Sequence, residues 1–161
     1  MQIRGLCLSL LLVVVACVEL DGSVLIGEHK IPNEWFDEPQ PDKWTLLYRA
    51  TEHGFDVSEF HSRCDNKGPT ITLVKSEFGG LFGGYTPISW TSPNMFKYYY
   101  DPKTFLFSLE GPKTTEPTKL ANDGPQCNST YSVKHSAFTG PGFGQDIRKS
   151  YKIALTITSH Q

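Results

Sequence analysis

The stretch FHSRCDNKGPTITLVKS, residues 60–76, places a His, a Cys and an Asp within five positions and then changes character. Its second half, residues 70–74, is rich in the β-branched side chains that favour strands. Between the two halves, Asn66 and Gly68 tolerate the left-handed backbone conformation that ends a helix, and Pro69 cannot continue one. The stretch therefore predicts a short helix that passes directly into a strand.

The residues before this stretch indicate where the helix begins. Asp56 can accept hydrogen bonds from the first-turn N–H groups, and Glu59, three residues later, can reach back to it as in a capping box. Phe55 can pack on Phe60 as a hydrophobic staple. We therefore expect a helix over residues 57–64.

Hydrophobic patterning predicts further strands. Residues 44–49 alternate between two sets of side chains, as in a half-buried strand, and residues 151–157 alternate again. Residues 104–109 hold three bulky apolar residues in a row, which predicts a strand buried on both faces. The aromatic cluster at residues 96–100 has an alternation that fits a core, and residues 111–130 are expected to form a polar loop.

A glycine-rich run, EFGGLFGGY at residues 77–85, follows the junction. It lacks the Gly-Lys-Ser/Thr of a phosphate-binding loop and the G-x-G-x-x-G spacing of a dinucleotide site. We expect a hairpin turn at Gly79 and Gly80. Gly83 and Gly84 then lie in the returning strand, where another backbone or a bulky ring approaches closely.

Composition limits the organisation and the partners of the chain. With 161 residues, 39% hydrophobic and 20% charged, the chain can bury one ordinary core, which predicts one domain. Its formal net charge of −2 gives no basic field of the kind that holds a phosphate backbone. We therefore expect no nucleic acid partner.

The N-terminus differs from the rest of the chain. A basic residue precedes an apolar run at residues 5–18, after which polar residues return. Secretory signal peptides have an apolar run of about 7 to 15 residues, whereas a membrane span needs about 20. We expect residues 1–22 to be a signal peptide, and cleavage near Gly22 or after Cys17 fits its pattern about equally well. Cleavage leaves a secreted, extracellular protein without a membrane span; a retained anchor or a cytoplasmic location is the alternative. Residues 23–43 then form a lead-in segment that docks through Trp35 and Phe36.

Cleavage of the signal would leave two cysteines, Cys64 and Cys127. In an oxidising compartment they are a candidate disulfide, worth about 4 kcal/mol through loop closure. Two buried free thiols are the alternative, because a sequence does not supply the Cα separation that a bridge requires. Asn128-Ser129-Thr130 is an N-glycosylation sequon beside Cys127, with Asn128 as the acceptor.

Several motifs, in this order along the chain, resemble the TLDc domain family, that of the oxidation-resistance proteins. They are Leu47-Tyr48-Arg49-Ala50, Gly54-Phe55, Phe60-His61, Cys64-Asp65-Asn66-Lys67-Gly68-Pro69-Thr70, Phe82-Gly83-Gly84-Tyr85, Ser89-Trp90 and Phe105-Leu106-Phe107-Ser108-Leu109. A late family motif, Gly-Pro-x-Phe-Gly followed by His-Asp, is present as Gly140-Pro141-Gly142-Phe143-Gly144-Gln145-Asp146 without its histidine. The resemblance therefore implies a TLDc-like domain at residues 44–161 whose C-terminal part is divergent or incomplete.

The resemblance also implies a fold and a role. The fold is α+β and mainly β, a sandwich of two antiparallel sheets with a few short flanking helices. The role is protection against oxidative damage, with no settled catalytic mechanism and no cofactor, and cytosolic members bind the vacuolar-type proton pump. A secreted chain would not meet that pump on its cytosolic side. The motif positions carried over as structural residues are Gly54, Phe55, Phe60, His61, Cys64, Asp65, Gly68, Pro69, Thr70, Phe82, Gly83, Gly84, Trp90, Phe107, Gly140, Pro141, Phe143 and Gly144.

Two function classes compete most directly. We favour a non-catalytic protein-interaction module with an unnamed protein partner, because no catalytic signature is found in the sequence. The alternative is a small thiol-dependent antioxidant enzyme that uses Cys64. Cys64 lies near the C-terminal end of its helix, where the helix dipole disfavours a thiolate, although His61 and Arg63 can offset this effect.

A metal site is the third hypothesis. His53, His61, Cys64 and Asp65 are ligand types close together in the sequence. Structural metal sites usually take a second, distant pair of ligands, and Cys127 with His135 matches no known spacing. We therefore assign no metal ligands and no catalytic residues from the sequence.

Overall fold

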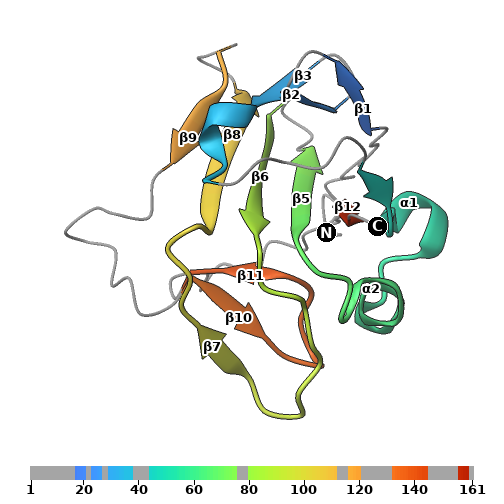
Figure 1. The fold of residues 1–161 in the computed structure, drawn as a ribbon. Coiled ribbons are helices and arrows are strands. Elements are labelled where there is room, and N and C mark those ends of the chain that lie inside the picture. The colour runs from blue at the N-terminus through green and yellow to red at the C-terminus, as the bar shows by residue number, and fades with distance from the viewer. Residues whose placement is uncertain are drawn as a thin grey trace, which may run out of the picture.

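The computed structural model describes residues 17–20, 23–26, 29–37, 44–75, 80–111, 116–120, 132–144 and 156–159. These residues form antiparallel sheets with a few short helices (Figure 1). The expected fold class, mainly β with antiparallel sheets and short flanking helices, is confirmed. No helix within these stretches is long and apolar enough to cross a membrane.

Three sheets are found among the described residues. The largest has the spatial order β4-β12-β5-β6-β8-β9, with bounds β4 Thr45–Leu46, β5 Thr70–Lys75, β6 Leu81–Thr86, β8 Phe105–Glu110, β9 Thr118–Leu120 and β12 Thr156–Ser159. The second has the order β11-β10-β7, with bounds β7 Lys97–Tyr99, β10 Val133–His135 and β11 Gly142–Phe143. The third joins β1 Cys17–Leu20, β2 Ser23–Ile26 and β3 His29–Pro32, and the helices are η1 Asn33–Trp35, α1 Ala50–His53 and α2 Val57–Cys64.

One face of the largest sheet packs against the N-terminal segment. Successive side chains of a strand point to opposite faces, so Phe105 and Phe107 of β8 share a face. The Trp35 ring lies 6.2 Å from that of Phe105 and 6.4 Å from that of Phe107, and the Phe36 ring lies 5.5 Å from that of Phe105. The expectation that this segment docks through Trp35 and Phe36 is therefore confirmed.

The other face of the largest sheet packs against the second sheet. Gly84 of β6 lies on this face, and a Cβ built on it would lie 2.7 Å from the ring of Phe143 in β11. Trp90 belongs to the same layer, because its indole N–H donates to the hydroxyl of Thr70 at the start of β5, at 2.9 Å. The core therefore extends on both sides of the central strands β5, β6 and β8, and Figure 1 shows the second sheet at one end of them.

The glycine pair in β6 behaves as expected. β5 and β6 pair antiparallel from Thr70↔Thr86 to Lys75↔Leu81, which confirms the hairpin, while residue 79 of its turn lies outside the described residues. A Cβ on Gly83 would lie 1.9 Å from the backbone oxygen of Thr72, so a neighbouring strand occupies that space. At Gly84 a bulky ring occupies it. Both close approaches that the sequence predicts are therefore present.

The helix-to-strand junction is confirmed, but its predicted cap is wrong. α2 covers Val57–Cys64, and Asn66 and Gly68 have φ of 60° and 85°. The Asp56 side chain makes no capping hydrogen bond; its backbone oxygen accepts the N–H of Glu59 at 3.1 Å instead. Phe55 stays 57% exposed, so no staple buries it. The burial of Phe60 and Cys64, rather than a side-chain cap at the first turn, stabilises this short helix.

Other expectations need correction. β8 is not buried on both faces, because Leu106, which shares the face of Gly84, is 40% exposed. Phe96 and Tyr100 are 62% and 55% exposed, so the alternation at residues 96–100 does not mark a core.

The expected loop at residues 111–130 contains β9, and α1 was not expected at all. Period-2 patterns locate strands but do not say which faces are covered.

Several predictions fall on residues that lie outside the described ones. They are residues 1–16 and 21–22 of the predicted signal peptide, Cys127, the sequon at Asn128 and most of the expected strand at 151–157. Within the predicted signal segment, Cys17–Leu20 forms β1, which pairs with β2. The signal peptide, the glycan and the disulfide stay predictions.

Candidate functional site

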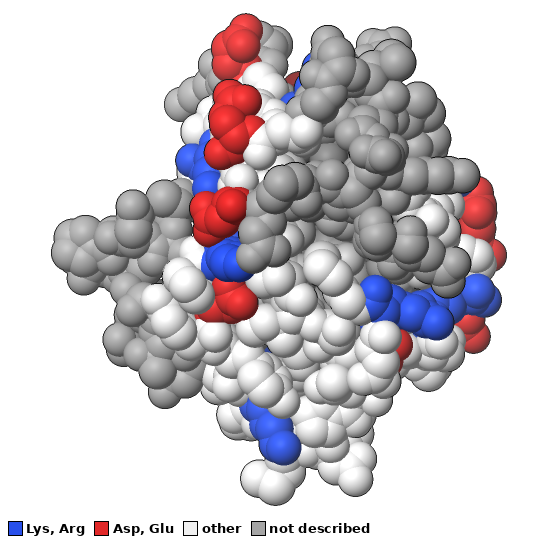
Figure 2. All heavy atoms as spheres, viewed as in Figure 1, with Lys and Arg blue, Asp and Glu red and all other residues white. Residues whose placement is uncertain are grey.

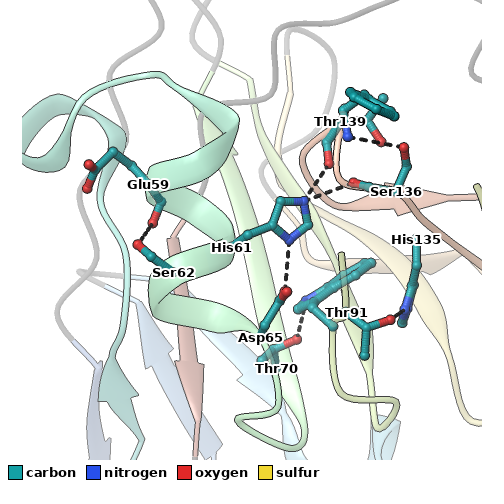
Figure 3. A network of polar contacts seen from close by, with 11 residues as sticks. Glu59, His61, Ser62, Asp65, Thr70, Thr91, His135, Ser136 and Thr139 are labelled. Carbon is teal, nitrogen blue, oxygen red and sulfur yellow. Dashed lines mark hydrogen bonds and ion pairs between the residues drawn. The ribbon is translucent and has the colours of Figure 1, made fainter. Parts of the chain in front are cut away.

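His61 joins α2 to a turn that is distant in the sequence. Its Nδ1 lies 2.8 Å from a carboxylate oxygen of Asp65, and its Nε2 lies 2.9 Å from the backbone oxygen of Ser136 and 3.1 Å from that of Thr139 (Figure 3). The carboxylate and the backbone oxygens are hydrogen-bond acceptors, and which ring nitrogen of His61 donates to them depends on the tautomer. Both nitrogens are therefore engaged in holding α2 to residues 136–139, and neither is left for a substrate or a metal ion.

The residues after α2 fasten the chain to Trp90. Asp65 and Trp90 form an isolated parallel β-bridge, and the Asn66 N–H donates to the backbone oxygen of Trp90 at 2.9 Å. The Gly68 N–H donates to the hydroxyl of Ser89 at 3.0 Å. The left-handed conformations of Asn66 and Gly68 thus turn the chain so that its N–H groups face the segment that carries Trp90.

Aromatic rings surround Trp90, which is 1% exposed. Its ring centre lies 6.0 Å from Phe60 of α2, 5.0 Å from His135 of β10 and 5.7 Å from Phe143 of β11. Such edge-to-face and tilted contacts add to the stability gained from burial. We call His61 together with these four rings the Trp90 junction; it holds α2, β10 and β11 together.

His135 is the second histidine of this junction and is 1% exposed. Its Nδ1 lies 2.9 Å from the Thr91 hydroxyl, whereas its Nε2 is buried and has no hydrogen-bond partner among the described residues. Burial lowers the pKa of His135 to about 4, an effect that Asp65 opposes and His61 reinforces. His135 is therefore neutral at physiological pH and packs as a ring.

Cys64 has the surroundings of a structural residue. Its side chain is fully buried, and its thiol is free in the structure. Burial, with a smaller contribution from Asp65, raises the pKa of Cys64 to about 12, and Arg63 only partly opposes this. Because the thiolate is the reactive form, this thiol is poorly suited to attack peroxide. The predicted bridge to Cys127 stays untested, because Cys127 lies outside the described residues.

The remaining metal candidate also has a structural contact. His53 Nδ1 accepts the backbone N–H of Arg49 at 2.9 Å, and its ring stacks on that of Tyr48 with centres 5.9 Å apart. The Tyr48 hydroxyl donates to the Gly54 backbone oxygen at 2.6 Å, and the pKa of Tyr48 is raised mainly by burial. Within the described stretches, no three His, Cys, Asp or Glu side chains are grouped to hold a metal ion.

The structure places the predicted motif residues in two groups. The first group lies at the Trp90 junction or contacts it through hydrogen bonds and packing: Phe60, His61, Cys64, Asp65, Gly68, Thr70, Gly84, Trp90 and Phe143. Those elsewhere are Gly54 and Phe55 near α1, Pro69, Phe82, Gly83 and Phe107 in the large sheet and its approach, and Gly140, Pro141 and Gly144 around β11. Half of the motif positions thus lie at or around one packed junction, and the other half are spread over α1, the large sheet and β11.

Sequence reasoning missed the structural role of His135 and of the turn that binds His61. His135 was considered only as a metal ligand, and Ser136 and Thr139 act through their backbone oxygens, which any residue carries. Alternation of Val133 and His135, both inward-facing in β10, is the signal that could have identified the histidine as buried.

Comparison with known proteins agrees with this architecture. Residues 30–160 match the model of the TLDc domain. "MTOR-associated protein MEAK7" of Danio rerio is 35% identical over 66 residues, which are 41% of this chain and 14% of the relative, and the Gallus gallus protein of that name is 30% identical over 96 residues, 60% and 19%. "Oxidation resistance protein 1" of Kluyveromyces lactis is 26% identical over 74 residues, which are 42% of this chain and 30% of the relative.

These alignments cover no more than 30% of each relative's length. The likeness therefore concerns one domain of those proteins and does not transfer their activities. The match to the TLDc domain covers most of the 161 residues and includes the Trp90 junction, so this chain belongs to the TLDc domain family.

Proposed function

We propose that this TLDc domain is a non-catalytic protein-interaction module with a role in protection against oxidative damage. The observation that carries this proposal is the burial of the side chains that look reactive. Cys64 is fully buried with its pKa raised to about 12, and both nitrogens of His61 are engaged by Asp65 and by backbone oxygens. Because the Cys64 thiol and the His61 ring are used in the interior of the domain, we propose that the domain acts through its surface.

The names of the relatives support the two parts of this proposal to different degrees. One relative is named an oxidation resistance protein and another an MTOR-associated protein, which indicates respectively a protective role and association with other proteins. The TLDc resemblance adds the vacuolar-type proton pump as a protein partner for a chain that stays in the cytoplasm. For a secreted chain, an extracellular protein is the partner that we propose.

We further propose that the chain is secreted as a glycoprotein. The basic start and apolar run before residue 19 support export, and the Asn128 sequon supports glycosylation. The test is expression of the full chain with a C-terminal tag in secretory cells, followed by mass analysis of the mature N-terminus. We expect protein in the medium that begins near residue 23 and carries one glycosidase-sensitive glycan, which Asn128→Gln removes. Retention in the cytoplasm without a glycan would contradict secretion and favour association with the pump.

The protective role is tested with peroxide challenge of cells that express the chain. We expect the wild-type chain to raise survival, and Cys64→Ala to raise it equally, with thermal unfolding used to show that the variant is folded. Protein captured on the tag from extracellular fluid should include a partner absent from tag-only controls. Survival that depends on Cys64 in a folded variant would favour the thiol-dependent enzyme and overturn the interaction module.

A further inference from the structure

Two adjacent loops at one end of the second sheet expose large apolar side chains. Met95 and Phe96, just before β7, are 78% and 62% exposed, and Phe138, in the turn between β10 and β11, is 74% exposed. The Ala137 N–H donates to the backbone oxygen of Pro93 at 3.0 Å, so the two loops lie side by side. Single exposed apolar residues are ordinary, but three large apolar side chains on two adjacent short loops indicate a contact surface.

The charged side chains of the two segments that carry these loops, residues 91–100 and 132–144, are basic. Lys97 is exposed, and the Lys134 ammonium lies 5.3 Å from the centre of the Phe96 ring. Residues 91–100 and 132–144 contain no Asp or Glu. Figure 2, viewed as Figure 1, shows this lowest part of the molecule as uncharged surface with basic atoms and without acidic ones. The loops therefore combine apolar side chains with positive charge that no carboxylate in these segments neutralises.

The shape of the surface helps to decide what it contacts. Each of the three apolar side chains is more than 60% exposed, so they project outward and do not line a groove of the kind that holds a peptide helix. Projecting apolar side chains can enter the boundary between headgroups and acyl chains, while lysines beside them keep their ammonium groups among anionic headgroups.

We propose that Met95, Phe96 and Phe138, with Lys97 and Lys134, form a membrane-docking end that binds reversibly to an anionic lipid surface. We use the name membrane-docking end for these five residues only. It is separate from the Trp90 junction and does not depend on the protein partner proposed above. It brings the domain to a membrane without a spanning helix.

Vesicle co-sedimentation tests this proposal. The full chain, purified from secretory cells, is mixed with vesicles of phosphatidylcholine alone or with about one third phosphatidylserine. We expect binding to the anionic vesicles, about tenfold weaker binding to the neutral ones, and loss of binding as salt is raised, because the attraction is screened. Equal binding to both kinds of vesicle, or binding to neither, would overturn the proposal.

Variants locate the contact. We expect Met95→Ser with Phe96→Ser to lower anionic vesicle binding about tenfold, and Lys97→Glu to lower it severalfold. The matched controls are Leu120→Ser, 51% exposed on β9, and Lys75→Glu, exposed at the end of β5, which should bind as the wild type does. Unchanged unfolding temperatures show that the variants are folded. If the double variant binds vesicles normally, or instead loses a captured protein, the end is not a membrane contact and the proposal fails.

Discussion

Two segments of the chain, residues 90–96 and 135–138, each run from the interior to the surface within a few positions. At their inner ends Trp90 and His135 are 1% exposed, and at their outer ends Phe96 and Phe138 are 62% and 74% exposed. A titratable imidazole is inside and phenyl rings are outside, which is the reverse of what residue type alone suggests. The difference teaches that the reactive-looking residues of this domain build its fold, while its plain apolar residues are available for contact.

The largest effect expected from breaking the interior is at the glycine pair that lets the strands approach. Gly83→Ala should lower the free energy of unfolding by about 4 kcal/mol or more, because its Cβ would meet the backbone oxygen of Thr72 at 1.9 Å, and backbone cannot move aside cheaply. Gly140→Ala is the matched control, since nothing lies within 4 Å of its Cβ, and should change stability by less than about 0.5 kcal/mol. Urea unfolding measures both. Equal stability of the two variants would contradict the close packing of β5 and β6.

The buried state of His135 predicts a dependence on pH. The pKa is about 4 in the folded chain and 6.5 when unfolded, so the neutral ring contributes stability above pH 6.5 that is lost as pH falls toward 4. The loss should reach about 3 kcal/mol, measured as the difference between wild type and His135→Phe in urea unfolding across this range. Asp65 and His61, the charged and titratable groups that act on His135, are present in both proteins, so the difference isolates the buried ring. Parallel pH profiles for the two proteins would show that His135 is not buried as a neutral ring.

The polar part of the Trp90 junction should matter somewhat less. His61→Ala removes the ring that contacts Asp65 and two backbone oxygens, and we expect it to cost about 2 kcal/mol. Ser62→Ala, next to it on the exposed side of α2, should cost less than about 0.5 kcal/mol. Thermal unfolding of the two variants measures the contrast. If both unfold at the wild-type temperature, His61 does not hold α2 to the 136–139 turn.

The smallest effect on stability is expected at the surface ends of the same segments. Met95→Ser with Phe96→Ser should change the free energy of unfolding by less than about 0.5 kcal/mol, because both side chains are mostly exposed. Calorimetry of this double variant beside His61→Ala tests the contrast between interior and surface. A loss above about 2 kcal/mol would mean that these side chains are packed and would remove the contrast.

Much of the fold could be predicted from local patterns. The junction at residues 57–75 follows from β-branched residues after Asn66, Gly68 and Pro69, whose backbone preferences are intrinsic. Gly83 and Gly84 likewise predicted that another part of the chain approaches closely. In the structure these are the Thr72 backbone at Gly83 and the Phe143 ring at Gly84. These features depend on a few neighbouring residues, so a sequence contains them.

The site was less predictable because its contacts are distant and partly backbone. His61 contacts oxygens 75 and 78 residues later in the chain, and no residue type marks a backbone acceptor. The exposure of Leu106 and Phe96 depends on which parts of each face other segments cover, and alternation alone does not report that coverage. The Asp56 cap was wrong for the opposite reason: the local signal was present, but a backbone oxygen made the contact.

The central claim is that the reactive-looking interior of this domain does no chemistry. The most direct test is the rate at which purified wild-type protein and Cys64→Ala consume hydrogen peroxide at neutral pH, with thermal unfolding confirming that both are folded. We predict the same slow rate for the two, because the buried Cys64 thiol, with its pKa near 12, is neither exposed nor ionised. Turnover by the wild type that disappears in Cys64→Ala would contradict the account and make Cys64 a catalytic thiol.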